Sequence, residues 1–349
     1  YALPDRPEKL PPLTFVIEWE NATDIEAEWT QEAMRAFEAE LARCKDRFVA
    51  KPYVFYLYDE QTVDESKIND VIAQVAPALP DLVNLELVAA VGLTYYQLKN
   101  FGISQAPTEI SIMLDSDAAP QPGWIDGILA PFGDPEIVAV GGFTVLGCKD
   151  LLSKMMALIW LFNLPSESDE TVRRKKIHVN NCAVRTAVFR QHPFPELPGA
   201  FKKQCGFWLR EIDRSGLKWV RTADAMVVHA PHPQIFFVAW RAWKMGMDND
   251  FQVFHLVSRS RFRRLWSAFV LPAKKTLRAW KRIWTKGGEV GLPTYQRPLA
   301  LLLSLGFHSS MMAGQLVSAV FRGFPPLPAT QTLPDRSAPV PGVQVREQA

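Results

Sequence analysis

The chain of 349 residues has few cysteines and no Cys-x-x-Cys pair, so a zinc ribbon or a thioredoxin-type motif is not expected. Its four cysteines, Cys44, Cys148, Cys182 and Cys205, lie far apart in the sequence. So few cysteines in a chain of this length argue against a disulfide framework. The first twelve residues are polar and proline-rich and have no signal-peptide apolar core. These absences predict a protein of a reducing compartment.

Two regions of the chain each lack one sign of charge, although the net charge is only +2. Residues 1–120 hold 9 Lys and Arg against 21 Asp and Glu, whereas residues 241–286 hold 12 against 2. A hydrophobic content of 48% excludes wholesale disorder. The acidic first part argues against nucleic acid as a partner. The asymmetry predicts a catalytic part joined to one that contacts an anionic surface.

Short apolar runs alternate with helical patterns over the first 120 residues. Strands are predicted at 13–19, 53–58, 85–91 and 110–114, and helices at 25–47, 66–75 and 95–104. This alternation predicts an α/β fold, with a mostly parallel sheet and helices on both faces. Ligands of such sheets bind beyond the carboxyl ends of the strands. We therefore expect Asp59 and Asp115, which each follow a strand, in one crevice.

The rest of the chain divides into a second mixed part, a basic part and a tail. The mixed part predicts a strand at 137–145 broken at Gly141-Gly142, helices at 151–164 and 204–215, and short strands at 218–221 and 225–229. Gly216 is a plausible C-cap. We expect an N-terminal segment over 1–12, one α/β domain over 13–235, basic amphipathic helices over 236–324 and a disordered tail over 325–349.

The strongest chemical signal is an acidic pair at a strand end, Asp115-Ser116-Asp117. Hard divalent cations prefer carboxylate oxygens and also bind diphosphate oxygens. The pair therefore predicts a Mg²⁺ or Mn²⁺ site that holds a nucleotide diphosphate. A solvated turn is the alternative, because Asp is common after strands and a D-x-D motif alone is weak.

The motif lies in a longer context, Tyr95-Tyr96-Gln97-Leu98-Lys99-Asn100-Phe101-Gly102 followed by Leu114-Asp115-Ser116-Asp117. This context resembles the inverting family-2 glycosyltransferases of the GT-A fold, in which a helix with an Asn-x-Gly-like element leads into the D-x-D strand. Further similar elements are Pro122-Gly123-Trp124, Val140-Gly141-Gly142 and residues 15–21, 58–62, 180–185 and 223–229. The resemblance covers roughly residues 13–250.

The resemblance implies a nucleotide-sugar donor, with a UDP-sugar as the first candidate, and a divalent metal held by Asp115, Asp117 and His229. Asp117 and His229 are also the candidate catalytic residues. The implied donor-binding residues are Asp59, Glu60, Lys99, Asp115, Ser116 and Asp117. The candidate acceptor-binding residues are Trp124, Asn181, Arg185 and Trp208. For three of these residues an interpretation without a role in binding or catalysis is also open: Lys99 as a solvated lysine, His229 as a structural histidine and Trp208 as part of the core.

The sequence departs from the family where the catalytic base is expected. A Glu-Asp pair normally opens the helix before the turn at Gly216, and here that place holds Gln204-Cys205. A free thiol has a pKa of about 8.5 and needs activation to act as a base near neutral pH. Three alternatives follow: another carboxylate or a histidine replaces the base, the acceptor is already acidic, or the protein is inactive.

The basic C-terminal part interleaves cations with Trp and Phe, as in Trp240-Arg241-Ala242-Trp243-Lys244. Such helices suit a bilayer interface, where Trp lies at headgroup depth and Lys and Arg meet anionic lipid. The alternative is an ordinary solvated face with Trp in the core. Residues 298–321 carry no formal charge and are long enough to span a bilayer. Their Gly, Ser, His and Gln content favours an interfacial or re-entrant helix.

Together these features predict a glycosyltransferase at the cytoplasmic face of the membrane. It would move a sugar from a nucleotide-diphosphate sugar to a glycan or lipid-linked acceptor, with a divalent metal and the membrane surface as partners. A catalytically degenerate GT-A scaffold and a nucleotidyltransferase are the alternatives. The missing Glu-Asp pair favours the first, and the shared nucleotide crevice and acidic metal site allow the second.

Overall fold

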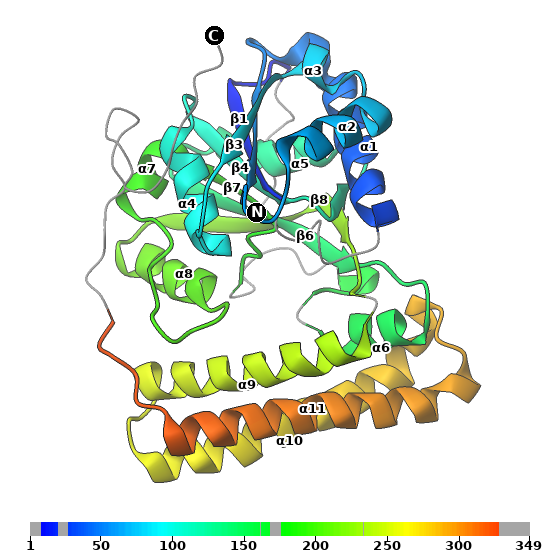
Figure 1. Cartoon of the computed structure of the whole chain (residues 1–349), viewed down its shortest axis with the longest axis vertical. Coiled ribbons are helices and arrows are strands. Elements are labelled where there is room, and N and C mark those ends of the chain that lie inside the picture. The colour runs from blue at the N-terminus through cyan, green and yellow to red at the C-terminus, as the bar shows by residue number, and fades with distance from the viewer. Residues whose placement is uncertain (1–7, 20–26, 161, 168–175, 233, 328–349) are drawn as a thin grey trace.

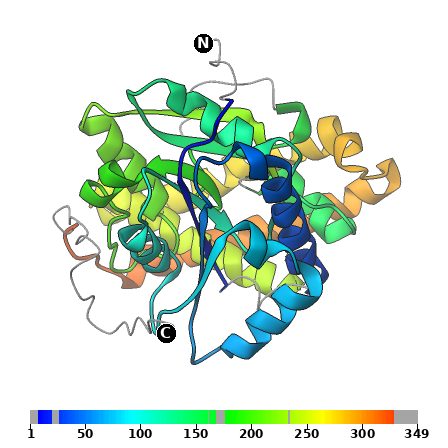
Figure 2. The ribbon, with the colours of Figure 1, turned by 90° about the horizontal axis from the view of Figure 1, so that it is seen from above.

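The computed structural model describes residues 8–19, 27–160, 162–167, 176–232 and 234–327. An α/β domain lies above a layer of long helices (Figure 1). Seen from above, the long helices pass behind the α/β domain (Figure 2). Most of the predicted N-terminal segment 1–12 and nearly all of the predicted tail 325–349 lie outside the described residues.

One sheet of eight strands forms the centre of the α/β domain. Its strands are β1 (Leu13–Glu18), β2 (Tyr53–Tyr58), β3 (Asn84–Ala89), β4 (Ile110–Asp115), β5 (Ala118–Pro120), β6 (Ile137–Leu146), β7 (Asn181–Arg185) and β8 (Lys218–His229). Their order is β3-β2-β1-β4-β7-β6-β8-β5. Strands β1 to β4 are parallel, and β7 is antiparallel to β4 and β6. The sheet confirms the predicted α/β class.

Helices cover both faces of the sheet because its strands are apolar on both sides. In β1, Phe15 and Ile17 point into one core and Val16 into the other, as the period of two requires. The first core is covered by α1 (Ala27–Cys44), α2 (Glu65–Val75), α3 (Leu79–Leu82) and α5 (Trp124–Leu129). The second is covered by α4 (Tyr95–Gln105), α7 (Thr186–Gln191) and α8 (Gln204–Arg214).

Three predicted elements differ in the structure. The helix predicted over 151–164 ends early as α6 (Leu151–Ile159), and Asn163 instead forms a bridge to Val145. The two short strands at 218–221 and 225–229 are one strand, β8. β6 continues through Gly141-Gly142, but its register with β8 shifts between Gly141 and Phe143. The glycines also make room for close neighbours, since a Cβ on Gly142 would lie 2.3 Å from Asn181. Gly216, with φ of +72°, caps α8 as predicted.

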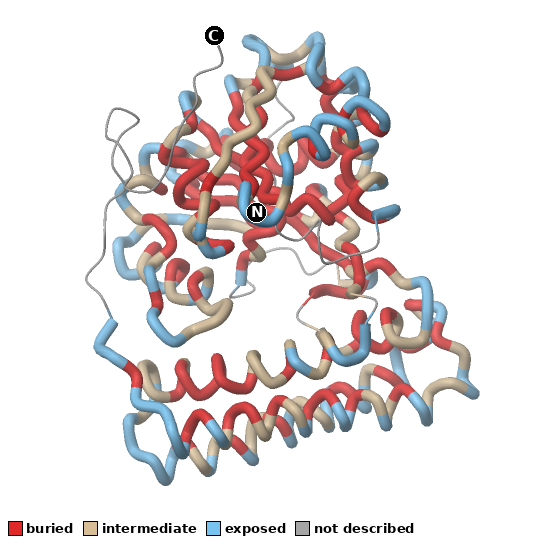
Figure 3. Tube along the Cα trace, viewed as in Figure 1, coloured by how far each residue is buried: buried red, intermediate tan, exposed pale blue. Residues whose placement is uncertain are grey.

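The helix layer consists of α9 (Ile235–Leu256), α10 (Arg261–Lys286) and α11 (Arg297–Phe321). Glycines allow α9 and α11 to touch backbone to backbone. A Cβ on Gly246 would lie 2.0 Å from the carbonyl oxygen of Met311, and one on Gly314 would lie 2.2 Å from that of Trp243. The outer sides of α10 and α11 are largely exposed, whereas the strands β1, β4 and β6 are almost wholly buried (Figure 3).

Candidate active site

The acidic pair lies at the carboxyl end of β4, where the chain turns into the short strand β5. Asp115 and Asp117 are 4% and 3% exposed. In β5, Ala118 is the register partner of His229, the last residue of β8. The backbone nitrogen of Ala230 also donates to the carbonyl of Asp117, at 2.9 Å. This pairing brings a histidine more than a hundred residues away in sequence against the two aspartates.

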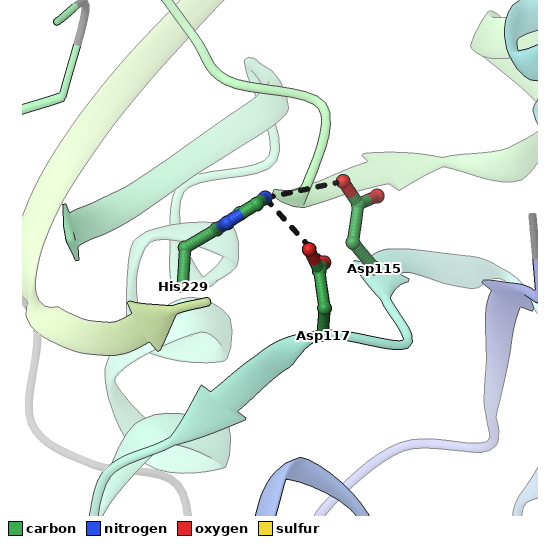
Figure 4. A group of neighbouring side chains, drawn as sticks. All are labelled: Asp115, Asp117 and His229. Carbon is green, nitrogen blue, oxygen red and sulfur yellow. Dashed lines mark ion pairs between the residues drawn. The ribbon is translucent and has the colours of Figure 1, made fainter. Parts of the chain in front are cut away.

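His229 points its Nε2 atom at both carboxylates (Figure 4). Nε2 lies 3.4 Å from Oδ1 of Asp117 and 3.8 Å from Oδ2 of Asp115. Its other ring nitrogen, Nδ1, lies 2.8 Å from the carbonyl oxygen of Ala230 and must be the donor there. That hydrogen bond fixes the ring and directs Nε2 to the carboxylates, as in histidines that bind metals.

The three side chains fit a divalent metal ion. One ligand atom from each of Asp115, Asp117 and His229 lies within 4.8 Å of the other two. Among the described residues, Oδ1 of Asp117 and the hydroxyl of Ser116 are buried and have no hydrogen-bond partner. Buried polar atoms are rarely left without a partner. Two carboxylates and an imidazole are ligands that Mg²⁺ or Mn²⁺ accepts.

Two residues of α4 hold the side chain of Asp115 in place by hydrogen bonds. The hydroxyl of Tyr95 donates to its carboxylate at 2.7 and 3.0 Å. The ammonium group of Lys99, which is fully buried, donates to its Oδ1 and to the carbonyl of Leu114, each at 3.0 Å. The resemblance implied Lys99 as a donor-binding residue, and in the structure its ammonium group holds Asp115.

The electrostatics of the three candidate ligands differ. Burial alone would raise the pKa of Asp115, but Lys99 and His229 hold it below its usual range. Burial and the neighbouring charge of Asp115 raise the pKa of Asp117 to about 6. Burial opposes a charge on His229, yet Asp117 and Asp115 raise its pKa to about 9. The group is therefore a concentration of negative charge that an imidazolium or a metal ion can offset.

The turn after β2 lies at the same edge of the sheet. Asp59 accepts hydrogen bonds from the backbone nitrogens of Gln61, at 2.9 Å, and Gly92, at 3.3 Å, so it ties the ends of β2 and β3 together. Glu60 is exposed in this turn. Because β1, β2 and β4 are parallel neighbours, Asp59 and Asp115 end at one edge, as predicted.

Of the four candidate acceptor-binding residues, the structure brings Asn181 close to this edge, as the register partner of Leu114. Trp124 and Asn181 are fully buried, and the indole nitrogen of Trp124 donates to the side chain of Asn181 at 2.9 Å. Trp208 packs against Phe189 and Phe194 in the core. Arg185 pairs with Ile110 at the opposite end of β4 and binds Glu109. Their aromatic and polar character is used for packing and pairing.

No catalytic base stands at the position where the resemblance expects one. Gln204 and Cys205 open α8, and the thiol of Cys205 lies 2.9 Å from the carbonyl oxygen of Ile177. Burial raises the pKa of this thiol to about 12. A group with that pKa holds its proton at neutral pH, so Cys205 cannot deprotonate an acceptor.

Three further residues at the site were not singled out from the sequence. Glu18, fully buried at the end of β1, is the register partner of Asp115. Tyr95 holds Asp115, as described above. Lys202, just before α8, places its ammonium group 4.3 Å from the centre of the Tyr95 ring. Of the three, only Glu18 could have been identified from the sequence, because it is an acidic residue at the end of a buried strand.

Comparison with known proteins identifies the fold. No protein-family model matches the sequence, and no curated protein sequence matches it significantly. Among solved structures, a mannosyltransferase of Pyrobaculum calidifontis with GDP-mannose and Mn²⁺ matches with a TM-score of 0.53 and 16% identity, over 91% of this chain and 89% of that one. GalNAc-T7 with UDP, GalNAc and Mn²⁺ matches at 0.45 and 13%, over 75% of this chain and 51% of that one. The first match and the topology establish a GT-A-type fold.

Proposed function

We propose that the protein is a metal-dependent glycosyltransferase that moves a hexose from a nucleotide-diphosphate sugar to an acceptor at the cytoplasmic face of a membrane. The observation that carries the proposal is the group of Asp115, Asp117 and His229 at the carboxyl edge of a GT-A-type sheet. Ligands of open α/β sheets bind at this edge. The mannosyltransferase with a similar fold binds GDP-mannose and Mn²⁺.

Each residue at the edge has a distinct task in this proposal. Asp115, Asp117 and His229 hold the metal, which when bound supplies a Lewis acid for the leaving diphosphate. Lys99 and Tyr95 keep Asp115 ionised and fixed in place. The turn at Asp59 and Glu60 contacts the nucleotide.

Donor binding tests the core of the proposal. Calorimetric titration of UDP-, GDP- and dTDP-sugars with Mn²⁺ should show binding to at least one of them. Asp115→Ala plus Asp117→Ala should weaken that binding at least about 100-fold, because both carboxylate ligands are lost. Asp81→Ala, an exposed carboxylate outside the edge, is the matched control. Equal affinity in EDTA, or in the double variant, contradicts the proposal.

The same protein preparation distinguishes sugar transfer from the two alternative functions. Cys205 at the base position favours a degenerate scaffold, which would bind a donor but show neither transfer nor hydrolysis over a panel of acceptors. A nucleotidyltransferase would move the nucleotide and release the sugar phosphate or pyrophosphate. Chromatography of the products from a doubly labelled donor distinguishes these outcomes from sugar transfer.

The membrane part of the proposal rests on the outer face of α10. Phe262, Trp266, Phe269 and Leu277 are 76%, 64%, 53% and 67% exposed. Their spacing of three, four and eight residues places them on one side of the helix. Exposed cations lie along the same helix, among them Arg261, Arg263, Lys274, Arg278 and Lys281. An apolar stripe flanked by cations suits the interface of an anionic bilayer.

Helix α11 contributes to the same outer surface. It lies within a 28-residue stretch, Thr294–Phe321, that is long and apolar enough to cross a membrane, with a mean hydropathy of 1.3. Leu299, Leu302 and Phe321 are 50%, 65% and 79% exposed. Its other side packs on α9 and α10, with 39% of its most apolar window buried. This packing supports an interfacial helix rather than a span.

Vesicle sedimentation tests the membrane contact. The protein should bind vesicles with anionic lipid and bind neutral vesicles more weakly. Trp266→Ser plus Phe269→Ser should lower vesicle binding about 10-fold or more without changing the unfolding temperature, because both side chains are exposed. Val49→Ser, an exposed residue of the α/β domain, is the control. Unchanged vesicle binding by the double variant contradicts this part of the proposal.

A further inference from the structure

The loop between α7 and α8 is held by residues of both the α/β domain and the helix layer. Near its start, the side chain of Asn100 on α4 donates to the carbonyl oxygen of Phe194, at 2.9 Å, and accepts from its backbone nitrogen, at 3.0 Å. Near its end, the carboxylate of Asp248 on α9 accepts from the backbone nitrogens of Phe201, at 2.6 Å, and Lys202, at 3.0 Å. The helix layer therefore fixes the part of the loop that leads into α8.

The side chain of Asp248 is only 2% exposed, and its charge is balanced where it lies. Burial raises the pKa of this carboxyl, and the neighbouring charges of Lys203 and Arg241 oppose that rise, together with its two hydrogen bonds. Each oxygen accepts from a different backbone nitrogen, and hydrogen bonds to a carboxylate are about twice as strong as neutral ones. Asp248 thus sets the backbone conformation at Phe201 and Lys202.

The two residues that Asp248 holds make their closest ring contacts with different parts of the molecule. The ring of Phe201 packs edge-on against that of Trp240 on α9, with ring centres 5.4 Å apart, and the guanidinium carbon of Arg241 lies 4.5 Å from its centre. The ammonium group of Lys202 instead lies 4.3 Å from the centre of the Tyr95 ring on α4. Phe201 therefore attaches the loop to the helix layer, while Lys202 reaches the α/β domain.

Lys202 brings a positive charge to the candidate metal site. The hydroxyl of Tyr95, whose ring it contacts, donates to both oxygens of Asp115. Burial raises the pKa of Asp117, and the charge of Lys202 is among those that oppose this rise. A lysine beside a divalent ion is repelled by it, whereas a diphosphate attracts both. The arrangement therefore suits a ligand that carries a diphosphate better than it suits a metal ion alone.

We infer that Lys202 binds the diphosphate of the donor and that Asp248 is the positioning residue that holds Lys202 beside the metal site. The inference rests on the proposed glycosyltransferase function and adds two residues to its donor site. An ammonium group is a compact charge that binds phosphate oxygens well, provided that the backbone brings it within reach. Because Asp248 lies on α9, the helix layer takes part in donor binding as well as in membrane contact.

Removal of the lysine charge should have opposite effects on the metal and on the diphosphate. Lys202→Gln should strengthen the binding of Mn²⁺ alone about threefold, because a repulsive charge is lost. The same variant should weaken the binding of a nucleoside diphosphate in saturating Mn²⁺ about 10-fold, because a charge-assisted contact is lost. A variant that only distorts the site would weaken both, and that result would overturn the inference.

A double-mutant cycle tests the positioning role of Asp248. Asp248→Asn keeps the size of the side chain but leaves one oxygen for two backbone nitrogens. It should weaken nucleoside diphosphate binding about fivefold in the wild-type chain and less than twofold in Lys202→Gln, because it acts through Lys202. The lost negative charge acting through space would instead strengthen this binding. Equal losses in both backgrounds overturn the inference. If Asp248→Asn does not fold, Phe201→Ala loosens the same loop and should give the same pattern.

Calorimetry on the full chain with UDP, GDP and dTDP selects the probe, which is the nucleotide that wild type binds most tightly with Mn²⁺. Two matched controls should keep both affinities within twofold: Lys51→Gln, an exposed lysine before β2 at the opposite end of the sheet, and Asp250→Asn, a buried α9 carboxylate that binds Arg264. Failure of wild type to bind Mn²⁺ or any of the three nucleotides removes the proposed function. Wild-type binding with unchanged nucleotide affinity in Lys202→Gln or in Asp248→Asn overturns the inference alone.

Discussion

The two regions of the molecule each bury aspartates and treat them in opposite ways. In the helix layer, both oxygens of Asp250 face Arg264, with Oδ1 accepting from Nε at 2.8 Å, and the hydroxyl of Ser318 donates to Oδ2 at 2.7 Å. At the sheet edge, Oδ1 of Asp117 is buried without a hydrogen bond from any described residue. The first carboxylate is paired with a cation and hydrogen-bonded, whereas the second faces the His229 imidazole through Oδ1, at 3.4 Å and without a hydrogen bond, so that this oxygen is available to a ligand.

This difference between Asp250 and Asp117 distinguishes a buried charge that stabilises the fold from one that is available to a ligand. A buried carboxylate with a permanent cationic partner ties elements together, here α9 to α10 and α11. A buried carboxylate with an oxygen that accepts no hydrogen bond from the described residues is costly until something binds there. Sequence composition shows an acidic and a basic region, but only the geometry shows which charges are already satisfied.

The largest expected effect is on the structural pair. Asp250→Ala leaves the guanidinium of Arg264 buried and unpaired, and we expect it to lower the free energy of unfolding by about 3–5 kcal/mol. Replacing both members, as Asp250→Ala plus Arg264→Met, should restore much of that loss because no charge remains buried. Urea unfolding measures both. Equal losses in the single and double variants would show that the charge balance of the pair is not what stabilises the helix layer.

The second effect concerns the functional carboxylates. Mn²⁺ at about 100 times its Kd should raise the free energy of unfolding by about 2.7 kcal/mol, because the ion binds only the folded chain. Asp117→Asn removes a ligand and should abolish this increase, while the unfolding free energy in EDTA should fall little, if at all. Asp81→Asn, at an exposed position, should keep the full Mn²⁺ effect. Retained stabilisation in Asp117→Asn would place the metal elsewhere.

Much of the fold was predictable because the local patterns agree with the global arrangement. The alternating strands and helices up to Asp115, the shared edge of Asp59 and Asp115, and the cap at Gly216 all follow from periodicity and turn chemistry. The glycines Gly141-Gly142 mark a shift of register with β8 and not an end of the strand, and they also let Asn181 and Ile177 approach it. A close approach of that kind depends on distant residues and leaves no local trace.

The site was predictable only in part. A D-x-D motif at a strand end is visible locally, and the resemblance added His229, which the structure brings to it. Trp124 shows the limit of sequence reasoning, because an aromatic side chain near a D-x-D motif can equally well stack on a sugar or pack in the core. Here it packs in the core. The roles of Tyr95 and Lys202 depend on packing between α4 and the loop before α8, so no local pattern could indicate them.

Two histidines, His229 and His178, lie against the ring of Phe162 and differ in the charges around them. Its ring centre lies 4.9 Å from that of His229 and 5.3 Å from that of His178. Carboxylates face His229, whereas burial, with Arg221 and Lys176 nearby, lowers the pKa of His178 to about 3. His178 is therefore neutral when folded, and the unfolded chain takes up its proton below pH 6.5.

The stability that neutral His178 contributes should be present above pH 6.5 and fall away as the pH drops toward 3. We expect wild type to lose about 1 kcal/mol more than His178→Gln between pH 7.5 and 5.5. Urea unfolding of both proteins across this range measures the difference. Parallel pH profiles would mean that His178 is protonated in the folded state.

The smallest expected effect is at Cys205, where the sequence departs from the family that it resembles. The thiol is buried against the Ile177 carbonyl, with a pKa raised by burial to about 12, so its removal takes away no base. Cys205→Ala should change the rate of sugar transfer less than about twofold and the stability by about 1 kcal/mol or less. A large loss of transfer in the alanine variant, with donor affinity intact, would make the thiol part of the chemistry. A gain of transfer in Cys205→Asp would instead show that the reaction uses a carboxylate base at this position.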